Sequence, residues 1–400
     1  MGKMHKNLLL FRQKHRHSSW AIHHRIIASI FKNKFEYLTA LLAMMSIFLS
    51  CYFAFTTKRS SDRMETISKV ILYSINEEFA DTMGLDISNI EDPVLFAEMW
   101  IALKSENQKL INEKIAEYEK KHPDNPYTYF ILGWYAQLNG NSESAKIYYS
   151  KSIELYANYA IAYNNRGYSK YLLGEYDSAL IDYNKAIELT PNYAEAYNSR
   201  GILKFSKKEY DGAIIDFSVA IELNPSYAMA YNNLAGVKIA KGDYDGAIAD
   251  YSKAIELTPY YAAAYNNRGY AKREKGDYDG AIMDFSIAIE LNPDFAKAYN
   301  NRGYAKYKKS DWDGAITDYT KSIELKNPEL WIPYCNRGIA KYEQNDYNDA
   351  ISDLSKAIEL KSDYAPAYKY RASAKRKNGD EKGAESDFKA AKMLENGTTK

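Results

Sequence analysis

Residues 262–295, which read AAAYNNRGYAKREKGDYDGAIMDFSIAIELNPDF, decide the fold, because residues 228–261, AMAYNNLAGVKIAKGDYDGAIADYSKAIELTPYY, carry almost the same pattern 34 residues earlier. A tyrosine marks this period, and it recurs at residues 129, 163, 197, 231, 265, 299, 334 and 368. One extra residue, near Lys326, makes the spacing before Tyr334 35 residues. Eight units therefore start at residues 126, 160, 194, 228, 262, 296, 331 and 365. A fixed period of this length predicts a chain built from stacked repeats.

Each unit predicts two helices when its positions are numbered from its start. Position 4 is aromatic, position 8 is usually Gly, position 20 is always Ala, position 24 is bulky and position 27 is small. The spacings of 4 and 8, and of 20, 24 and 27, place these side chains on single helix faces, large opposite small. Turns such as Lys241–Asp245 separate the helices, and proline at position 32 ends the second. A single hairpin cannot bury its apolar face, so we expect neighbours to stack into a solenoid.

This pattern resembles the tetratricopeptide repeat over residues 126–398. The resemblance implies an all-α, right-handed superhelical solenoid of helical hairpins. Upstream, Ile111, Ile115 and Tyr118 fall at positions 20, 24 and 27 of a hypothetical unit, with Pro123 at position 32. Residues 92–125 are therefore expected to form a degenerate capping hairpin ahead of the eight repeats.

The N-terminal region predicts a membrane anchor. Residues 37–57 hold no charged side chain, and as a helix they would span about 32 Å, close to the hydrocarbon core of a bilayer. Residues 58–91 are expected to form a linker with an amphipathic helix marked by Ile67, Ile71 and Ile75. Alternatives for residues 37–57 are a buried core helix and a cleaved signal peptide, and lipidation of Cys51 is a further possibility.

Charge asymmetry orients the predicted span. The basic tail, residues 1–36, contributes all eight Lys and Arg residues that precede Lys58. The positive-inside rule then places the N-terminus in the cytoplasm and the solenoid outside it, in the periplasm if the source is bacterial. The five histidines of the tail favour a polybasic stretch attracted to anionic lipid over a metal site, since no Cys or carboxylate joins them. A likeness to mitochondrial import receptors would instead put the solenoid in the cytosol.

Composition excludes several classes of function. The whole chain carries 53 Lys and Arg against 52 Asp and Glu, and the excess of basic residues lies in the N-terminal tail, so the repeat region is acidic. Binding of nucleic acid is therefore not expected. Two distant cysteines cannot make a structural zinc site, and no phosphate loop, dinucleotide fingerprint or nucleophile elbow is present. We expect no enzyme activity, no metal and no cofactor.

The candidate peptide-binding residues lie on the first helix of each unit. The resemblance implies that these helices line a concave groove, and position 6 places an asparagine there in five units. Such a ladder resembles that of the O-linked N-acetylglucosamine transferase, where asparagines hold the backbone of an extended polypeptide; an amide offers both a donor and an acceptor to a peptide unit. Recent duplication of one unit is the alternative explanation. The ladder comprises Asn165, Asn233, Asn267, Asn301 and Asn336.

Aromatic residues at positions 9 and 12 of the same helices are expected to add apolar pockets to the groove. They include Tyr168, Tyr270, Tyr304 and Tyr307, for which packing at the edge of the core is the alternative. The repeats that bind chaperone C-termini use several basic groove residues, and Lys297 with Lys308 is a poor match to that pattern.

The predicted function is a non-enzymatic, membrane-anchored scaffold that binds extended polypeptide segments in its groove and assembles protein complexes. A substrate-recognition or regulatory subunit for a separate enzyme needs the same groove and is the main alternative. Homo-oligomerisation through the solenoid is a third.

Position 7 departs from the family pattern, because six units carry arginine there and the same six carry aspartate at position 23. The predicted antiparallel hairpin brings these positions within reach of one another, so we expect six Arg–Asp pairs between helices; an anion-binding site is the alternative. The arginines are Arg166, Arg200, Arg268, Arg302, Arg337 and Arg371, and the aspartates are Asp182, Asp216, Asp284, Asp318, Asp353 and Asp387.

Overall fold

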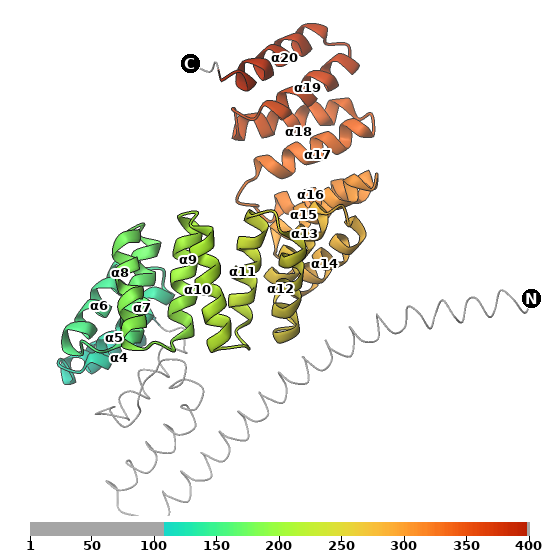
Figure 1. The fold of residues 1–400 in the computed structure, drawn as a ribbon. Helices are drawn as coiled ribbons and strands as arrows, with labels where there is room; N and C mark the ends of the chain where they lie inside the picture. The colour runs from blue at the N-terminus through green and yellow to red at the C-terminus, as the bar shows by residue number, and fades with distance from the viewer. Residues whose placement is uncertain (1–107, 398–400) are drawn as a thin grey trace, which may run out of the picture. The chain divides into compact units, whose positions relative to one another are not determined.

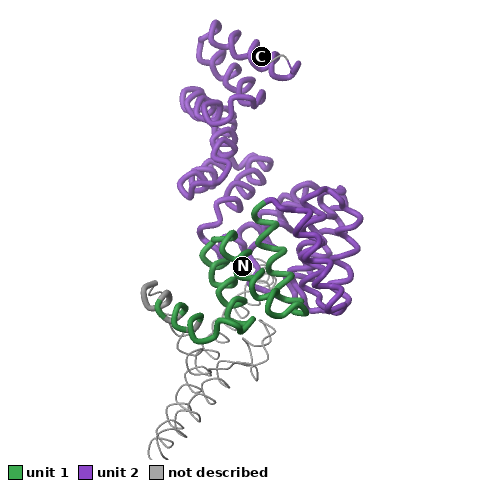
Figure 2. Tube along the Cα trace, turned by 90° about the vertical axis from the view of Figure 1, so that its left-hand side faces the viewer, with its two compact units in different colours: residues 1–173 green, residues 174–400 purple. Residues whose placement is uncertain are grey.

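The computed structural model describes residues 108–397, and its regular structure there is helical (Figure 1). The chain divides into two compact units, residues 1–173 and 174–400 (Figure 2). The predicted basic tail at 1–36, the span at 37–57, the linker at 58–91 and the first helix of the capping hairpin lie outside the described residues. Within residues 108–397, no helix combines the length and apolar character needed to cross a membrane.

The described part of the first unit contains four helices, α4 (Gln108–Lys121), α5 (Pro126–Leu138), α6 (Ser142–Leu155) and α7 (Ala160–Leu172). Its core is aromatic. The Phe130 ring lies 5.6 Å from that of Tyr149 and 5.0 Å from that of Tyr159, centroid to centroid. All three side chains are buried, and Ala145 and Ala162 fill the space between them. The α5–α6 hairpin thus packs large residues against small ones, as the repeat pattern predicts.

The second unit begins with α8 (Tyr176–Leu189) and continues as six consecutive helical hairpins, each packed against the next. The described part of this unit is therefore an all-α solenoid of helical hairpins. The hairpins are α9–α10 (Ala194–Ser206, Tyr210–Leu223), α11–α12 (Ala228–Ala240, Tyr244–Leu257), α13–α14 (Ala262–Glu274, Tyr278–Leu291), α15–α16 (Ala296–Lys308, Trp312–Glu324), α17–α18 (Trp331–Glu343, Tyr347–Leu360) and α19–α20 (Ala365–Lys377, Glu381–Glu395).

Glycine at position 8 lets the two helices of a hairpin approach closely. A Cβ atom on Gly269 would lie 2.9 Å from Cε1 of Phe285, and one on Gly303 would lie 2.9 Å from Cε1 of Tyr319. Real Cβ atoms do not approach other atoms so closely, because steric repulsion exceeds the dispersion attraction at such distances. The ring at position 24 therefore lies directly on the glycine backbone, and the two positions fix the spacing of each hairpin.

The turn between the two helices has a fixed conformation at position 15. The backbone there is left-handed, with φ of +79° at Gly242 and +82° at Gly276. Glycine adopts this region without the steric cost that a Cβ atom imposes. Ser310 occupies the same position with φ of +63°. The residue after it often caps the second helix; for example, Asp277 accepts a hydrogen bond from the Gly280 backbone N–H at 2.9 Å.

The extra residue before Tyr334 changes the connection between α16 and α17. Lys326 is left-handed with φ of +52°, and the buried Asn327 side chain donates to Ser322 Oγ at 3.0 Å. Asn327 Oδ1 accepts from the Glu329 backbone N–H at 3.0 Å, while Ser322 Oγ donates to the Ala296 carbonyl at 2.8 Å. The longer connection is therefore a hydrogen-bonded turn anchored to the start of α15.

Candidate peptide-binding surface

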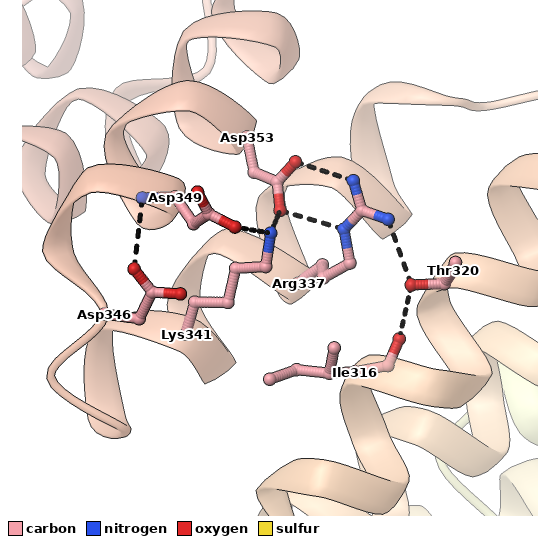
Figure 3. A network of polar contacts seen from close by, with 7 residues as sticks. All are labelled: Ile316, Thr320, Arg337, Lys341, Asp346, Asp349 and Asp353. Atoms are coloured by element: carbon pink, nitrogen blue, oxygen red, sulfur yellow. Dashed lines mark hydrogen bonds and ion pairs between the residues drawn. The ribbon is translucent and has the colours of Figure 1, made fainter.

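Arginine at position 7 and aspartate at position 23 pair within one hairpin. Arg337 Nε and Nη2 donate to the two carboxylate oxygens of Asp353 at 2.8 and 2.7 Å (Figure 3). The same two-bond contact joins Arg200 to Asp216, Arg268 to Asp284, Arg302 to Asp318 and Arg371 to Asp387. Five of the six predicted pairs are thereby confirmed. Arg166 and Asp182 belong to different compact units, so the sixth pair stays a prediction.

Each of these arginines also reaches the preceding repeat. Arg337 Nη1 donates to Thr320 Oγ1 on α16 at 3.0 Å, and Arg268 Nη1 donates to Ser252 Oγ on α12 at 3.0 Å. The arginine side chain lies over the tyrosine three residues before it, with a distance of 5.5 Å from the Arg337 guanidinium carbon to the Tyr334 ring centroid. One guanidinium thus joins two helices of its own hairpin to the neighbouring hairpin.

Lysine at position 11 also belongs to this network. Lys341 Nζ lies 2.9 Å from Asp353 Oδ2 and 3.2 Å from Asp349 Oδ2 (Figure 3). The lysines at the equivalent position, Lys204, Lys272, Lys306 and Lys375, bind the other four aspartates at 2.8 to 2.9 Å. Each buried carboxylate thus binds an arginine and a lysine at once, so both cations are engaged inside the hairpin, which favours a structural role for them over an anion site in those five units.

The fourth unit, which starts at residue 228, lacks this arginine and shows its effect. Leu234 takes its place, and Asp250 keeps only the lysine, with Lys238 Nζ at 2.6 Å from Oδ2. Burial raises the pKa of Asp250 above its ordinary value, although Lys238 opposes the shift. At Asp387 burial also favours the neutral acid, but hydrogen bonds from Arg371 and Lys375 outweigh it and hold the pKa below its ordinary value. In the Arg371 unit, the hydrogen bonds from the arginine and the lysine therefore offset the effect of burial on the pKa of the aspartate, whereas the lysine alone does not do so at Asp250.

The asparagine ladder links successive repeats. Asn301 Nδ2 donates to Asn266 Oδ1 at 3.0 Å, and Asn266 Nδ2 donates to its neighbour Asn267 at 3.1 Å. The same two steps repeat to Asn198, so one chain of amide hydrogen bonds crosses three repeat junctions. Its remaining bonds run from Asn267 to Asn232 at 3.3 Å, Asn232 to Asn233 at 3.4 Å and Asn233 to Asn198 at 2.9 Å, and a separate bond joins Asn336 to Asn300 at 3.2 Å.

These bonds use only part of the hydrogen-bonding capacity of each asparagine side chain. An asparagine side chain has two N–H groups and an oxygen with two lone pairs. Asn267 spends one donor on Asn232 and one lone pair on Asn266, which leaves one of each. Asn267 is half-buried, and so are Asn165, Asn233 and Asn336, whereas Asn301 is buried. The ladder therefore has a structural role that sequence reasoning did not predict, and it retains hydrogen-bonding capacity for a bound backbone.

The predicted aromatic residues fall into three groups. Tyr270 and Tyr304 flank the guanidinium of Arg273, whose carbon lies 4.4 and 4.8 Å from the two ring centroids. Tyr307 donates to Glu343 at 3.5 Å, and burial together with Glu343 raises its pKa to about 12. Tyr168, in the first compact unit, stacks on Tyr171 with ring centroids 6.5 Å apart.

A cleft of about 320 Å³ brings four of the predicted residues together in the second unit. Asn301, Asn336, Tyr270 and Tyr304 line it, from the first helices α13, α15 and α17. Asn233, Asn267 and Tyr307 do not line this cleft, and Asn165 and Tyr168 lie in the first unit. Sequence reasoning named Lys297 as a groove residue but missed the other main lining residues, which include Arg273, Glu329, Trp331, Cys335 and Tyr364. A sequence signal for two of them exists, because Trp331 and Cys335 differ from the residues that most other units carry at positions 1 and 5.

Sequence comparison matches the repeats to known families over more than half of the chain. Residues 167–207, 236–272 and 269–310 match the family described as TPR repeat. Residues 335–397 and residues 126–159 each match families described as tetratricopeptide repeat. A comparison with curated proteins gave no significant match.

The chain is also similar to several solved structures. YrrB, described as a TPR protein with an unusual peptide-binding site, is 25% identical over 46% of this chain and 95% of its own, with a TM-score of 0.38. MamA is 30% identical over 43% of this chain and 94% of its own, with a TM-score of 0.36. The Cut9–Hcn1 hetero-tetramer of APC/C is 15% identical over 83% of this chain and 70% of its own, with a TM-score of 0.54, and shares the fold. With its repeats, hairpins and matched segments in agreement, the chain belongs to the tetratricopeptide repeat proteins, a typically non-enzymatic family of scaffolds for interactions between proteins.

Proposed function

We propose that this protein is a non-enzymatic scaffold that binds extended polypeptide segments along the first helices of its repeats. One observation carries the proposal: amides of the ladder and aromatic rings from successive repeats meet in a single cleft. Asn336 offers hydrogen-bonding groups there, and Tyr270 and Tyr304 offer ring surface. An extended peptide presents the complementary groups, backbone N–H and C=O together with side chains on alternating sides.

Two asparagines of one hydrogen bond provide a matched test. Asn301 and Asn266 share the bond between their side chains, but only Asn301 lines the cleft. Replacing either one with Ala removes this contact between repeats. Asn266→Ala also removes the bond to Asn267, whereas only Asn301→Ala removes a group that lines the cleft. We expect Asn301→Ala to weaken a peptide selected on the full-length chain by about 1 kcal/mol more than Asn266→Ala does. Equal affinities for the two variants would remove the ladder from the binding site.

We also propose that residues 37–57 anchor the scaffold in a membrane and that its hairpins form a right-handed superhelix on the far side from the cytoplasm. The uncharged stretch and the basic tail before it support this orientation. Protease added to intact cells or spheroplasts should degrade the repeats and spare a tail-linked fragment. Digestion only after lysis would place the repeats in the cytosol and favour an import-receptor-like topology. A recognition subunit for a separate enzyme uses the same groove, and proteins captured by the repeats would reveal it.

A further inference from the structure

Two second helices differ from the others on their outer face, the face opposite the buried positions 20, 24 and 27. α10 and α14 contain no Lys or Arg, whereas α6, α8, α12, α16, α18 and α20 each contain at least one. Position 26 is lysine in five units but Val219 in α10 and Ile287 in α14. At position 22 the same two helices carry Ile215 and Met283, which are 62% and 61% exposed. Residues four apart lie on one side of a helix, so each helix presents an apolar pair there.

A carboxylate without a partner lies beside each apolar pair. In five other units the lysine at position 26 pairs with the glutamate at position 29, as Lys253 does with Glu256 at 3.0 Å. Glu222 and Glu290 occupy position 29 of α10 and α14, are exposed, and make no ion pair among residues 108–397. The other acidic side chains of the two helices all bind Lys or Arg: Asp211, Asp216, Asp279 and Asp284. Each outer face therefore combines apolar surface with one exposed negative charge that no described residue neutralises.

The two hairpins share this face although they differ elsewhere. Position 22 is Ile in one and Met in the other, and position 26 is Val in one and Ile in the other, so the identities differ while the apolar character is kept. On the first helices, position 9 is Ile202 in one hairpin and Tyr270 in the other, and position 12 is Phe205 in one and Arg273 in the other. Single exposed apolar residues are common, but the same apolar pair beside an unpaired carboxylate in two helices indicates a surface with a partner.

We propose that the outer faces of α10 and α14 are a docking surface for a basic amphipathic helix of a partner protein. The apolar side of that helix packs on Ile215 and Met283, and its Lys or Arg side chains pair with Glu222 and Glu290. Between the two helices, α12 carries only Ala249 at position 22, so the apolar ridges of α10 and α14 flank a lower surface that accepts a ridge of side chains from a helix. The docking surface belongs to the second helices and is independent of the peptide groove.

Charge distinguishes this partner from two other apolar surfaces. The same face of a second copy presents the same two glutamates, and an anionic lipid surface presents phosphates. Like charges that meet across an interface oppose association, whereas Lys and Arg complement this face. The occupant is therefore a cationic segment of another protein.

The test selects helical peptides on the full-length chain. A display library of helices of about 20 residues, roughly 30 Å long, has its surface positions randomised. Clones that also bind a variant with Val219→Lys and Ile287→Lys are then discarded. This variant restores the lysine that five other units carry, and thermal unfolding checks that it folds. Peptides that bind the groove bind both proteins and are lost at this step, so the outcome does not depend on the proposed function.

We expect the remaining helices to carry an apolar stripe flanked by Lys or Arg. An absence of remaining clones, or remaining clones without an excess of basic residues, overturns the proposal.

One of the selected helices, made synthetically, separates the two contributions. Replacing both glutamates, Glu222→Gln with Glu290→Gln, should weaken its binding about tenfold and abolish the dependence of binding on salt. Ile215→Ala with Met283→Ala should weaken binding to a similar extent and preserve the dependence on salt. Ile181→Ala is the matched control, because Ile181 is 67% exposed at position 22 of a helix whose glutamate is paired, and it should leave binding unchanged. Equal losses from the control and the test variants would contradict the proposal.

Sedimentation velocity of the full-length chain tests a second copy as the occupant. We expect the intact chain and the variant with Val219→Lys and Ile287→Lys to have the same mass at every concentration. Self-association that only the variant loses would assign the surface to a second copy and overturn the proposal of a basic partner.

Discussion

Arg337 and Asp353 are bound through two parallel hydrogen bonds of 2.8 and 2.7 Å, and the third guanidinium nitrogen reaches Thr320 on the neighbouring repeat. A planar guanidinium can serve three acceptors at once, whereas an ammonium acts as a point charge. The recurrent arginine therefore couples formation of a hairpin to its docking on the hairpin before it. Nearest-neighbour coupling of this kind is the term that gives a repeat array its cooperativity.

Removing an aspartate from position 23 should lower the free energy of unfolding more in units that carry the arginine at position 7. Asp284→Ala leaves Arg268 and Lys272 without their buried partner, and breaking a buried pair in this way costs about 3 to 5 kcal/mol. Asp250→Ala removes a partner of Lys238 alone, and we expect a loss of about 0 to 1 kcal/mol. Chemical denaturation of the two variants beside the intact chain measures the difference. Equal losses would show that position 23 owes its role to some contact other than the arginine.

Amide substitutions at two aspartates should act in opposite directions. At pH 7, Asp250→Asn should stabilise the fold, because burial raises the pKa of Asp250 and makes its ionised form unfavourable. Asp387→Asn should destabilise it, because Arg371 and Lys375 hold the pKa of Asp387 below its ordinary value.

The pH dependence of these two effects also differs in sign. The contribution of Asp387 is present above its unfolded pKa and lost as pH falls through its lower folded pKa. That of Asp250 is present at low pH and lost as pH rises through its raised folded pKa. Melting temperatures from pH 3 to 7 should therefore converge with that of the intact chain at the acidic end for both variants. A destabilised Asp250→Asn variant at pH 7 would contradict this account.

Two glycines, both within first helices, should respond oppositely to alanine. Gly269→Ala places a Cβ 2.9 Å from Phe285 Cε1 and 3.2 Å from the Ala281 carbonyl oxygen, so we expect a loss of about 1 to 3 kcal/mol from overpacking. A Cβ on Gly236 meets only Tyr251 Oη, at 3.9 Å, so Gly236→Ala should gain about 0.5 to 1 kcal/mol from helix propensity. Equilibrium unfolding distinguishes them, and a gain from Gly269→Ala would mean that the hairpin can open without cost.

The left-handed turn residue offers a stabilising change. Ser310 has φ of +63° at a position where five other units carry glycine, so Ser310→Gly should stabilise the chain by about 0.5 to 1 kcal/mol. Gly276→Ser, the reverse change at φ of +82°, should destabilise it by a similar amount. Thermal melts of both variants check the pair of signs. Loss of stability in Ser310→Gly would indicate that the serine side chain makes a contact worth more than the backbone strain.

The amino-acid sequence by itself determined the hairpins and the Arg–Asp pairs, for a physical reason. The spacing of residues along a helix is a local property, and the 34-residue period repeats it in every unit. Each unit therefore gives the same evidence for two packed helices. Position 8 against position 24, and Arg337 against Asp353, follow once two helices run antiparallel within one unit. Leu234 stands at position 7, where six other units carry arginine, so comparison of the units also showed where an Arg–Asp pair is missing.

Only the tertiary structure decided what happens between units. The bond from Asn301 to Asn266 and the joint lining of a cleft by Arg273 and Trp331 depend on the register between neighbouring hairpins. That register results from packing of many side chains and from the hydrogen-bonded turn at Asn327. The sequence showed the extra residue of this turn but not its hydrogen bonds to Ser322 and Glu329. The sequence therefore predicted some of the cleft residues, such as Asn301 and Tyr304, while the stacking of the hairpins determined which residues meet.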